Sequence, residues 1–192
     1  MARSVRSILQ RLRSFSLAER GAAAVEFALI LPIMLAVYIG AMEGSTLIIM
    51  DRKVQSVAGA VGDLVARADG SVSTSQLRDY FRAASGIMTP YPSGDVLQVV
   101  TAINVASDGR TSVLWSSQFQ NGTYSSTTTH RVGTTYPLPA EMIAISRGRT
   151  VIAAEATYSY TPLFGIVIDQ AVRLYRSNFY LPRFGGTITR TN

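Results

Sequence analysis

The sequence predicts an α+β protein in which a long N-terminal helix, able to cross a membrane, precedes a small head with one short helix and an antiparallel sheet. Three observations predict this fold. A nearly uncharged apolar stretch lies close to the N-terminus, and an apolar stripe with helical spacing follows it. The second half then alternates apolar and polar residues between turn signals. The 192 residues suffice for one modest domain plus an extension.

The basic side chains gather at the N-terminus. Five arginines and one glutamate precede Gly21, which is an excess of +4 out of the net charge of +6. This leaves 13 of the 18 basic and 11 of the 12 acidic side chains for the rest of the chain. A nucleic-acid-binding domain would carry its basic residues on the folded part. We therefore expect no nucleic-acid partner, and the charge indicates membrane topology instead.

The apolar segment 22–50 contains two formally charged residues, Glu26 and Glu43. The uncharged stretch 27–42 is shorter than the roughly 20 residues that a spanning helix needs, but extension at either end makes it long enough. Because more basic residues precede the segment than follow it closely, the N-terminus is expected in the cytoplasm and the C-terminal part outside. Three interpretations compete: an uncleaved signal anchor, a cleaved secretory signal, for which no A-x-A site follows, and a helix processed at its start.

Glu26 favours the third interpretation, because a carboxylate within an apolar span usually has a functional partner. The residues RGAAAVEF, which run from Arg20 to Phe27, resemble the processing site of type IV prepilins, where a prepilin peptidase cuts after a glycine. The resemblance implies cleavage between Gly21 and Ala22. The extended run RGAAAVEFALILP resembles more closely the TadE-like proteins, which are minor pilins or pseudopilins of the tight-adherence (Tad, Flp) pilus system.

This resemblance implies a non-enzymatic protein needed to assemble a Tad/Flp-type adhesion pilus. It would sit in the bacterial inner membrane as a single-pass protein, with its N-terminus cytoplasmic and its C-terminal domain periplasmic. Its partners would be the prepilin peptidase, other pilins or pseudopilins, the assembly platform and membrane lipid. In such an assembly the new ammonium of Ala22 can pair with Glu26 of a neighbour and fix the axial register, with Phe27 beside it. The alternative is an uncleaved, membrane-anchored periplasmic scaffold of an envelope or secretion complex.

Beyond the apolar segment the helix is expected to continue to about Ala68. Gly40 and Gly44 form a G-x-x-x-G spacing, which would let a second helix approach closely but is also common in membrane helices. Glu43 is expected near the outer headgroups without a role of its own. The apolar stripe that follows has spacings of three and four residues and consists of Leu47, Met50, Val54, Val57, Val61, Leu64 and Ala68.

The head is expected to begin with a short helix over 75–86, capped by Ser73 or Thr74. A strand over 97–105 turns at Asp108-Gly109 into a second strand, which ends near Ser116. The Ser/Thr-rich residues 117–137 form either an exposed excursion or a looser hairpin at Asn121-Gly122. Further strands are expected over 150–160 and 171–181, with a turn or short helix between them.

The parts expected are therefore a basic leader over 1–21, a transmembrane and extended amphipathic helix over 22–69, and an exported α+β head over 70–192. The stretch 158–164 reads Y-x-Y-x-P-L-F and resembles the C-terminal region of TadE-like proteins. The chain has no cysteine, and its one histidine, His130, is expected on the surface of a loop. Neither a nucleophile elbow nor a phosphate-binding loop occurs. We therefore expect no catalytic, cofactor-binding or metal-binding residue.

Overall fold

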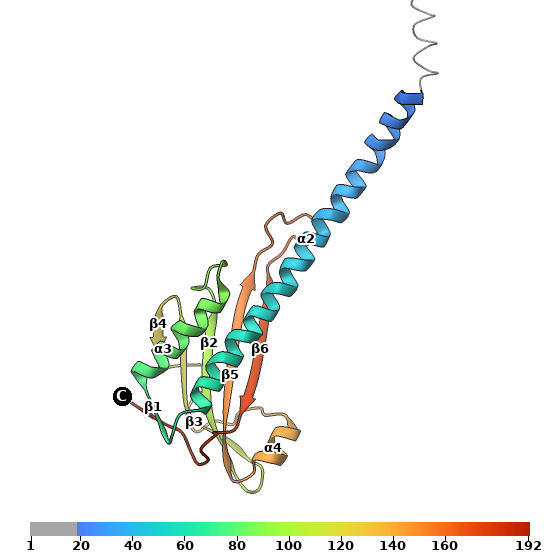
Figure 1. Ribbon diagram of the computed structural model, residues 1–192. Coiled ribbons are helices and arrows are strands. Elements are labelled where there is room, and N and C mark those ends of the chain that lie inside the picture. Colours follow the sequence, from blue (N-terminus) through green and yellow to red (C-terminus); the bar gives the residue numbers. More distant parts are fainter. Residues whose placement is uncertain (1–18) are drawn as a thin grey trace, which may run out of the picture. The chain divides into compact units, whose positions relative to one another are not determined.

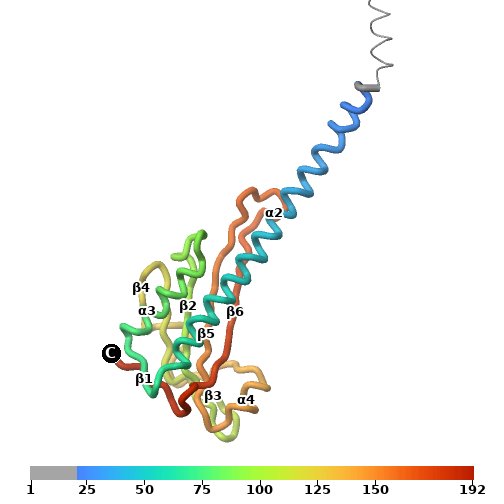
Figure 2. The backbone as a smooth tube through the Cα atoms, viewed as in Figure 1, coloured from blue at the N-terminus to red at the C-terminus, as the bar shows by residue number. Residues whose placement is uncertain are grey.

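The structure is a computed structural model that describes residues 19–192, with side chains from residue 21 onward. Most of the expected leader thus lies outside the described residues. The chain forms two compact units. One comprises the N-terminal part of a long helix, up to Ser45, together with the loop Pro162–Asp169; the other comprises Thr46–Thr161 and Gln170–Asn192. That helix, α2, spans Glu19–Ala66, and Figure 2 follows the backbone from it onward.

The C-terminal part of α2 forms one side of the core of the second unit. Its apolar stripe is buried from Met50 through Val61, as the spacing predicts. The stripe then continues at Val65, which is fully buried, while the expected Leu64 is only half-buried. The helix ends at Ala66, two residues earlier than expected. Apart from this end point, the prediction that the helix continues beyond the apolar segment is confirmed.

Five antiparallel strands form the sheet of this unit, in the order β4-β3-β2-β5-β6. Their bounds are β2 Leu97–Val105, β3 Thr111–Gln120, β4 Thr123–Ser125, β5 Arg149–Tyr160 and β6 Val172–Tyr180. Of the two expectations for residues 117–137, the hairpin at Asn121-Gly122 forms, between β3 and β4. Both turn residues adopt positive φ values, of 50° and 74°, which asparagine and glycine tolerate best.

Helices cover both faces of the sheet (Figure 1). On one face, α2 packs beside α3 (Thr74–Ser85), whose capping box at Ser73 confirms the expected start. A short 3₁₀ helix, η1 (Gly86–Met88), follows α3. On the other face, a smaller core lies beneath α4 (Ala140–Ser146), which the sequence did not predict.

A second, two-stranded sheet joins distant segments of the chain. β1 (Ser71–Ser73) pairs in parallel with β7 (Thr189–Thr191), close to the C-terminus. Nearby, the indole Nε1 of Trp115 donates to the carbonyl of Ile188 at 2.7 Å. Strands of three residues carry too little alternation to be predicted from sequence, so this pair was not expected.

Candidate functional site: the apolar helix and its carboxylates

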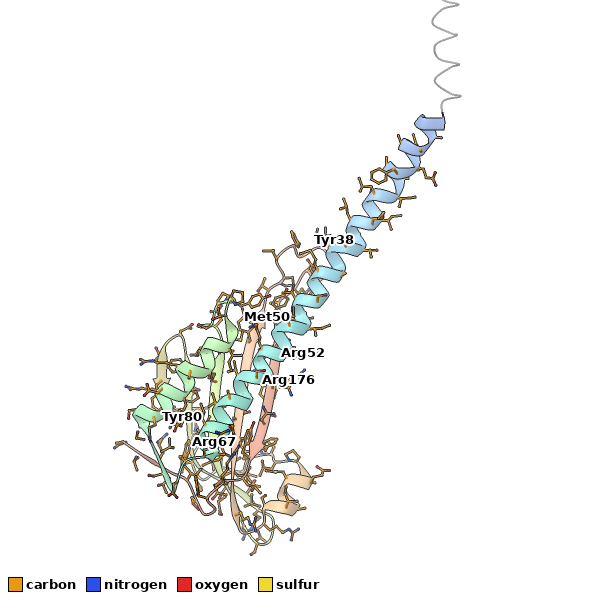
Figure 3. All side chains as sticks on the ribbon, viewed as in Figure 1. Tyr38, Met50, Arg52, Arg67, Tyr80 and Arg176 are labelled. Atoms are coloured by element: carbon orange, nitrogen blue, oxygen red, sulfur yellow. The ribbon has the colours of Figure 1, made fainter. Side chains whose placement is uncertain are left out.

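The N-terminal part of α2 exposes apolar side chains on all sides (Figure 3). Within residues 19–192, one helix is long and apolar enough to cross a membrane, and none of its most apolar window is buried within the chain. The core helix of a soluble protein would bury much of such a surface. This helix therefore fits a single-pass membrane anchor.

The residues expected at the processing site lie on the first turns of this exposed helix. Gly21, Ala22, Glu26 and Phe27 are all exposed. A Cβ added at Gly21 would meet no atom within 4 Å. No ion pair joins Glu26 to any other side chain that the structure describes. These four residues thus lie close together on the exposed start of the helix, and none of them packs into the core that the structure describes.

Glu43 lies at a different kind of site, because its carboxylate binds backbone amides of the Pro162–Asp169 loop. Oε1 accepts from the N–H of Ile166 at 3.2 Å, and Oε2 accepts from the N–H groups of Val167 and Ile168 at 3.1 and 3.0 Å. Only 2% of Glu43 is exposed. From the sequence, Glu43 was expected near the outer headgroups without a role of its own, and this expectation was incomplete. Three successive N–H groups satisfy the buried carboxylate without a cation.

The same loop packs against α2 one turn earlier. A Cβ on Gly40 would lie 3.2 Å from Cγ2 of Val167, so the absence of a side chain lets the loop approach the helix. Gly44 has no neighbour within 4 Å of a Cβ. Gly40 thus faces a segment of its own chain. A role for Gly40 and Gly44 in packing against a second helix stays a prediction.

One comparison with known proteins bears on this helix. A family model described as TadE-like protein matches residues 21–62. Over this segment the chain is similar to TadE-like proteins. The matched segment begins at Gly21, contains all six residues proposed from the sequence, and ends at Gly62. The resemblance seen in the sequence is thereby confirmed over this segment, and it suggests a Tad pilus-associated protein. No curated protein and no solved structure matches the chain.

The end of the TadE-like segment holds the helix against the sheet by close packing. A Cβ added at Gly62 would lie 2.4 Å from the ring of Tyr180 and 2.9 Å from Cβ of Ala154, so only glycine fits at this distance. One turn earlier, the hydroxyl of Tyr180 donates to the carbonyl of Gly59 at 3.1 Å. At this point the helix therefore approaches the sheet through glycine, beside the larger buried residues of its apolar stripe.

Polar contacts flank this packed seam. Arg176 of β6 pairs with Asp51 at 2.5 Å. Arg183 pairs with Asp63, which also binds Arg67 on the next turn of the helix. On the side of α3, the ammonium of Lys53 donates to the carbonyls of Ile87 and Thr89 at 2.7 and 2.8 Å. Exposed pairs of this kind add little stability one by one.

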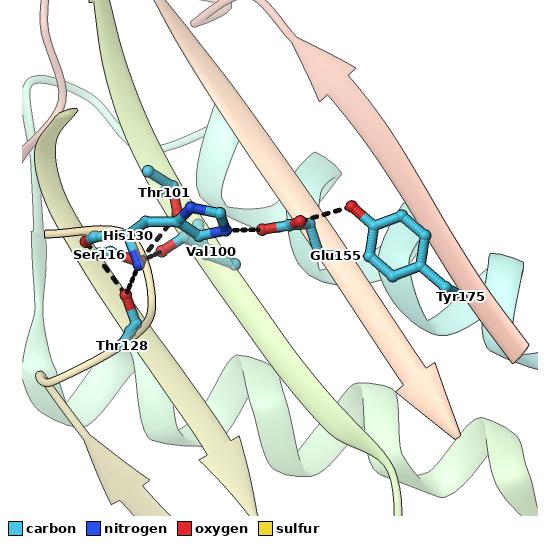
Figure 4. Close-up of polar contacts among 7 residues, drawn as sticks. All are labelled: Val100, Thr101, Ser116, Thr128, His130, Glu155 and Tyr175. Atoms are coloured by element: carbon cyan, nitrogen blue, oxygen red, sulfur yellow. Dashed lines mark hydrogen bonds and ion pairs between the residues drawn. The ribbon is translucent and has the colours of Figure 1, made fainter. Parts of the chain in front are cut away.

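Glu155, on β5, forms the centre of a polar cluster on the opposite face of the sheet (Figure 4). It binds Nε2 of His130 at 2.7 Å and accepts from the hydroxyl of Tyr175 at 2.5 Å. Partial burial and this hydrogen bond raise the pKa of Tyr175 to about 12. Burial and the charge of Glu155 also raise the pKa of Tyr136, whose ring contacts His130. His130, which was expected on the surface of a loop, is instead partly buried and paired with Glu155 of the sheet.

The described residues offer little that resembles a catalytic or metal site. Among residues 19–192, no three His, Asp or Glu side chains gather to hold a metal ion. An open hollow of about 470 Å³ lies between β5 and the segment after β6, with Arg149 and Arg183 in its lining. The TadE-like family is non-enzymatic in general.

Proposed function

We propose that the chain is a minor pilin or pseudopilin that a prepilin peptidase cuts between Gly21 and Ala22 and that then takes part in assembling a Tad/Flp-type adhesion pilus. The observation that carries the proposal is the register of the TadE-like match, which starts at Gly21. From that residue onward, α2 exposes an apolar surface interrupted by one early carboxylate, that of Glu26. This arrangement supports the proposal that lipid surrounds the helix first and that other helices surround it later.

Before cleavage, α2 would anchor the chain in the inner membrane. The arginines that precede Gly21 favour a cytoplasmic N-terminus, so the head would fold in the periplasm. The head has no cysteine and therefore relies on its packed core rather than on disulfides. Removal of the leader would take away the cytoplasmic charges that hold the helix in this orientation, and so would allow its transfer from lipid into an assembly.

Glu26 would then set the position of the subunit in the assembly. It is flanked by Val25 and Phe27, both more than half exposed, so an assembly that buries this surface also buries the carboxylate. A lone carboxylate in an apolar setting is costly unless it meets a cation. Cleavage creates such a cation, the ammonium of Ala22, on every neighbouring subunit. A buried pair of this kind adds less to stability than to the specificity of the register.

The experiment compares Glu26→Gln with the control Glu141→Gln, which removes an exposed carboxylate from the first turn of α4. Glu26→Gln is expected to insert into the membrane and to be cut, because the Gly21–Ala22 bond is intact. It should fail to co-purify with pilus components and should abolish adherence, while Glu141→Gln retains both. Normal co-purification and piliation of Glu26→Gln would refute the register role. A wild-type chain that keeps its leader in cells making the peptidase would favour the uncleaved scaffold.

A further inference from the structure

The Pro162–Asp169 loop carries a contiguous group of exposed apolar side chains. Leu163 is 84% exposed, and Phe164, Ile166 and Val167 are each at least half exposed. The loop contains no charged residue before Asp169. Single exposed apolar residues are common, but a contiguous group on one short loop marks a surface that contacts something apolar.

The position of the loop along α2 indicates what this surface contacts. Glu43 holds the loop one residue beyond Met42, and Val167 packs on Gly40. A helix from Ala22 to Met42 rises about 30 Å at 1.5 Å per residue, which is the thickness of the hydrocarbon core of a bilayer. The loop is therefore held where the membrane-spanning part of the helix ends. Two further apolar side chains near this end of the span, those of Tyr38 and Met42, are exposed as well.

The contact with Glu43 also removes the main obstacle to placing a loop in lipid. Irregular backbone is excluded from the apolar part of a bilayer unless its N–H groups have partners within the protein. Glu43 supplies acceptors for three successive N–H groups, those of residues 166–168. In return, these donors satisfy a carboxylate that would otherwise be costly at the edge of the bilayer.

We propose that the Pro162–Asp169 loop inserts its apolar side chains into the interface of the outer leaflet, and that Glu43 is the positioning residue that holds it there. The inference rests on the proposal that α2 spans the membrane. It adds a second membrane contact, in a loop that is far along the sequence from that helix. The bound surface is lipid rather than another protein, because the loop lies at the level where the span meets the headgroups. The loop would thus set how deeply the helix sits before it is extracted.

The absence of cysteine makes a direct test possible with the full-length chain. Leu163→Cys is labelled with an environment-sensitive fluorophore, and the purified protein is reconstituted at low density into phosphatidylethanolamine–phosphatidylglycerol vesicles. Lipids with a nitroxide quencher near the headgroup or deep in the acyl chain report the depth of the label. The matched controls are Leu35→Cys, on the exposed surface of the expected span, and Val132→Cys, an exposed apolar position in the other unit.

The label at residue 163 is expected to be quenched by the shallow nitroxide, the label at 35 by the deep one, and the label at 132 by neither. Adding Glu43→Leu to Leu163→Cys should abolish the quenching at 163, whereas Glu43→Gln, which keeps one acceptor oxygen, should retain part of it. Quenching at 163 that Glu43→Leu leaves unchanged would overturn the positioning role of Glu43.

Two results would overturn the membrane contact, and they differ in what else they refute. Quenching at 35 without quenching at 163 would overturn the loop insertion alone, as expected if the loop packs on another protein subunit instead. Absence of quenching at both positions would overturn the membrane anchor proposed above and the loop insertion with it. Quenching at 132 equal to that at 163 would show that the head adsorbs without selectivity, and would also overturn the proposal.

Discussion

Two glycines of α2, one turn apart, provide a sharp test of how the helix packs on the sheet. A Cβ at Gly62 would lie 2.4 Å and 2.7 Å from ring carbons of Tyr180, closer than real contacts allow. A Cβ at Gly59 would meet the nearest atom, Nδ2 of Asn178, at an ordinary 3.4 Å. The same change to alanine at the two positions should therefore alter the free energy of unfolding in opposite directions.

The magnitudes follow from two opposing effects. Alanine is favoured over glycine inside a helix by about 1 kcal/mol, so Gly59→Ala should stabilise the head by up to that amount. Overpacking a well-filled core costs about 1–3 kcal/mol, so Gly62→Ala should destabilise the head by up to about 2 kcal/mol after the same helix gain. The two variants should thus differ by about 1–3 kcal/mol.

Urea unfolding of the full-length chain in detergent measures this difference. Trp115, the single tryptophan, is buried in the head and reports its unfolding by fluorescence. The midpoint should rise for Gly59→Ala and fall for Gly62→Ala, with unchanged slopes that indicate the same two-state transition. Equal shifts in the same direction would refute the close approach of α2 to β5 and β6.

Three further predictions address other parts of the structure. The pKa of Tyr175 is raised to about 12 in the folded protein, so its contribution to stability is full below pH 10 and is lost as the pH rises toward 12. Tyr175→Phe should therefore reduce the fall in the urea midpoint between pH 8 and 11. An unchanged fall would contradict this. Met50→Ala should cost about 2–5 kcal/mol of unfolding free energy, whereas exposed Ile49→Ala should cost little, so equal losses would refute the assigned stripe. A reporter active only in the periplasm, fused after Asn192, should be active, and activity of a cytoplasmic reporter alone would reverse the topology.

Local patterns in the sequence sufficed to predict the longer elements of the head, α3, β2, β3, β5 and β6. The alternation over 97–105 and the Asp108-Gly109 turn define their hairpin without help from the rest of the chain, and the cap at Ser73 defines the start of α3. The end of the apolar stripe was predicted less well. Leu64 and Val65 are both apolar, so spacing alone could not decide which one faces the sheet.

Contacts between distant segments were beyond prediction. The partners of Glu43 are backbone N–H groups more than 120 residues away, and backbone groups carry no residue-specific signal. The pairing of His130 with Glu155 depends in the same way on a loop folding back over the sheet. One signal was present, since a second carboxylate at the end of an apolar helix requires partners as much as the first one does.

The identity of the first residue of the mature protein decides whether the chain is processed as a pilin. The chain is isolated from membranes of cells that make the prepilin peptidase, and its N-terminus is sequenced and its intact mass measured. If the peptidase cuts after Gly21, the first residue is Ala22, and replacing Gly21 with a bulky residue leaves the leader attached. A wild-type chain that begins at Met1 or Ala2 in these cells would contradict processing and, with it, the proposed role as a pilin-like subunit.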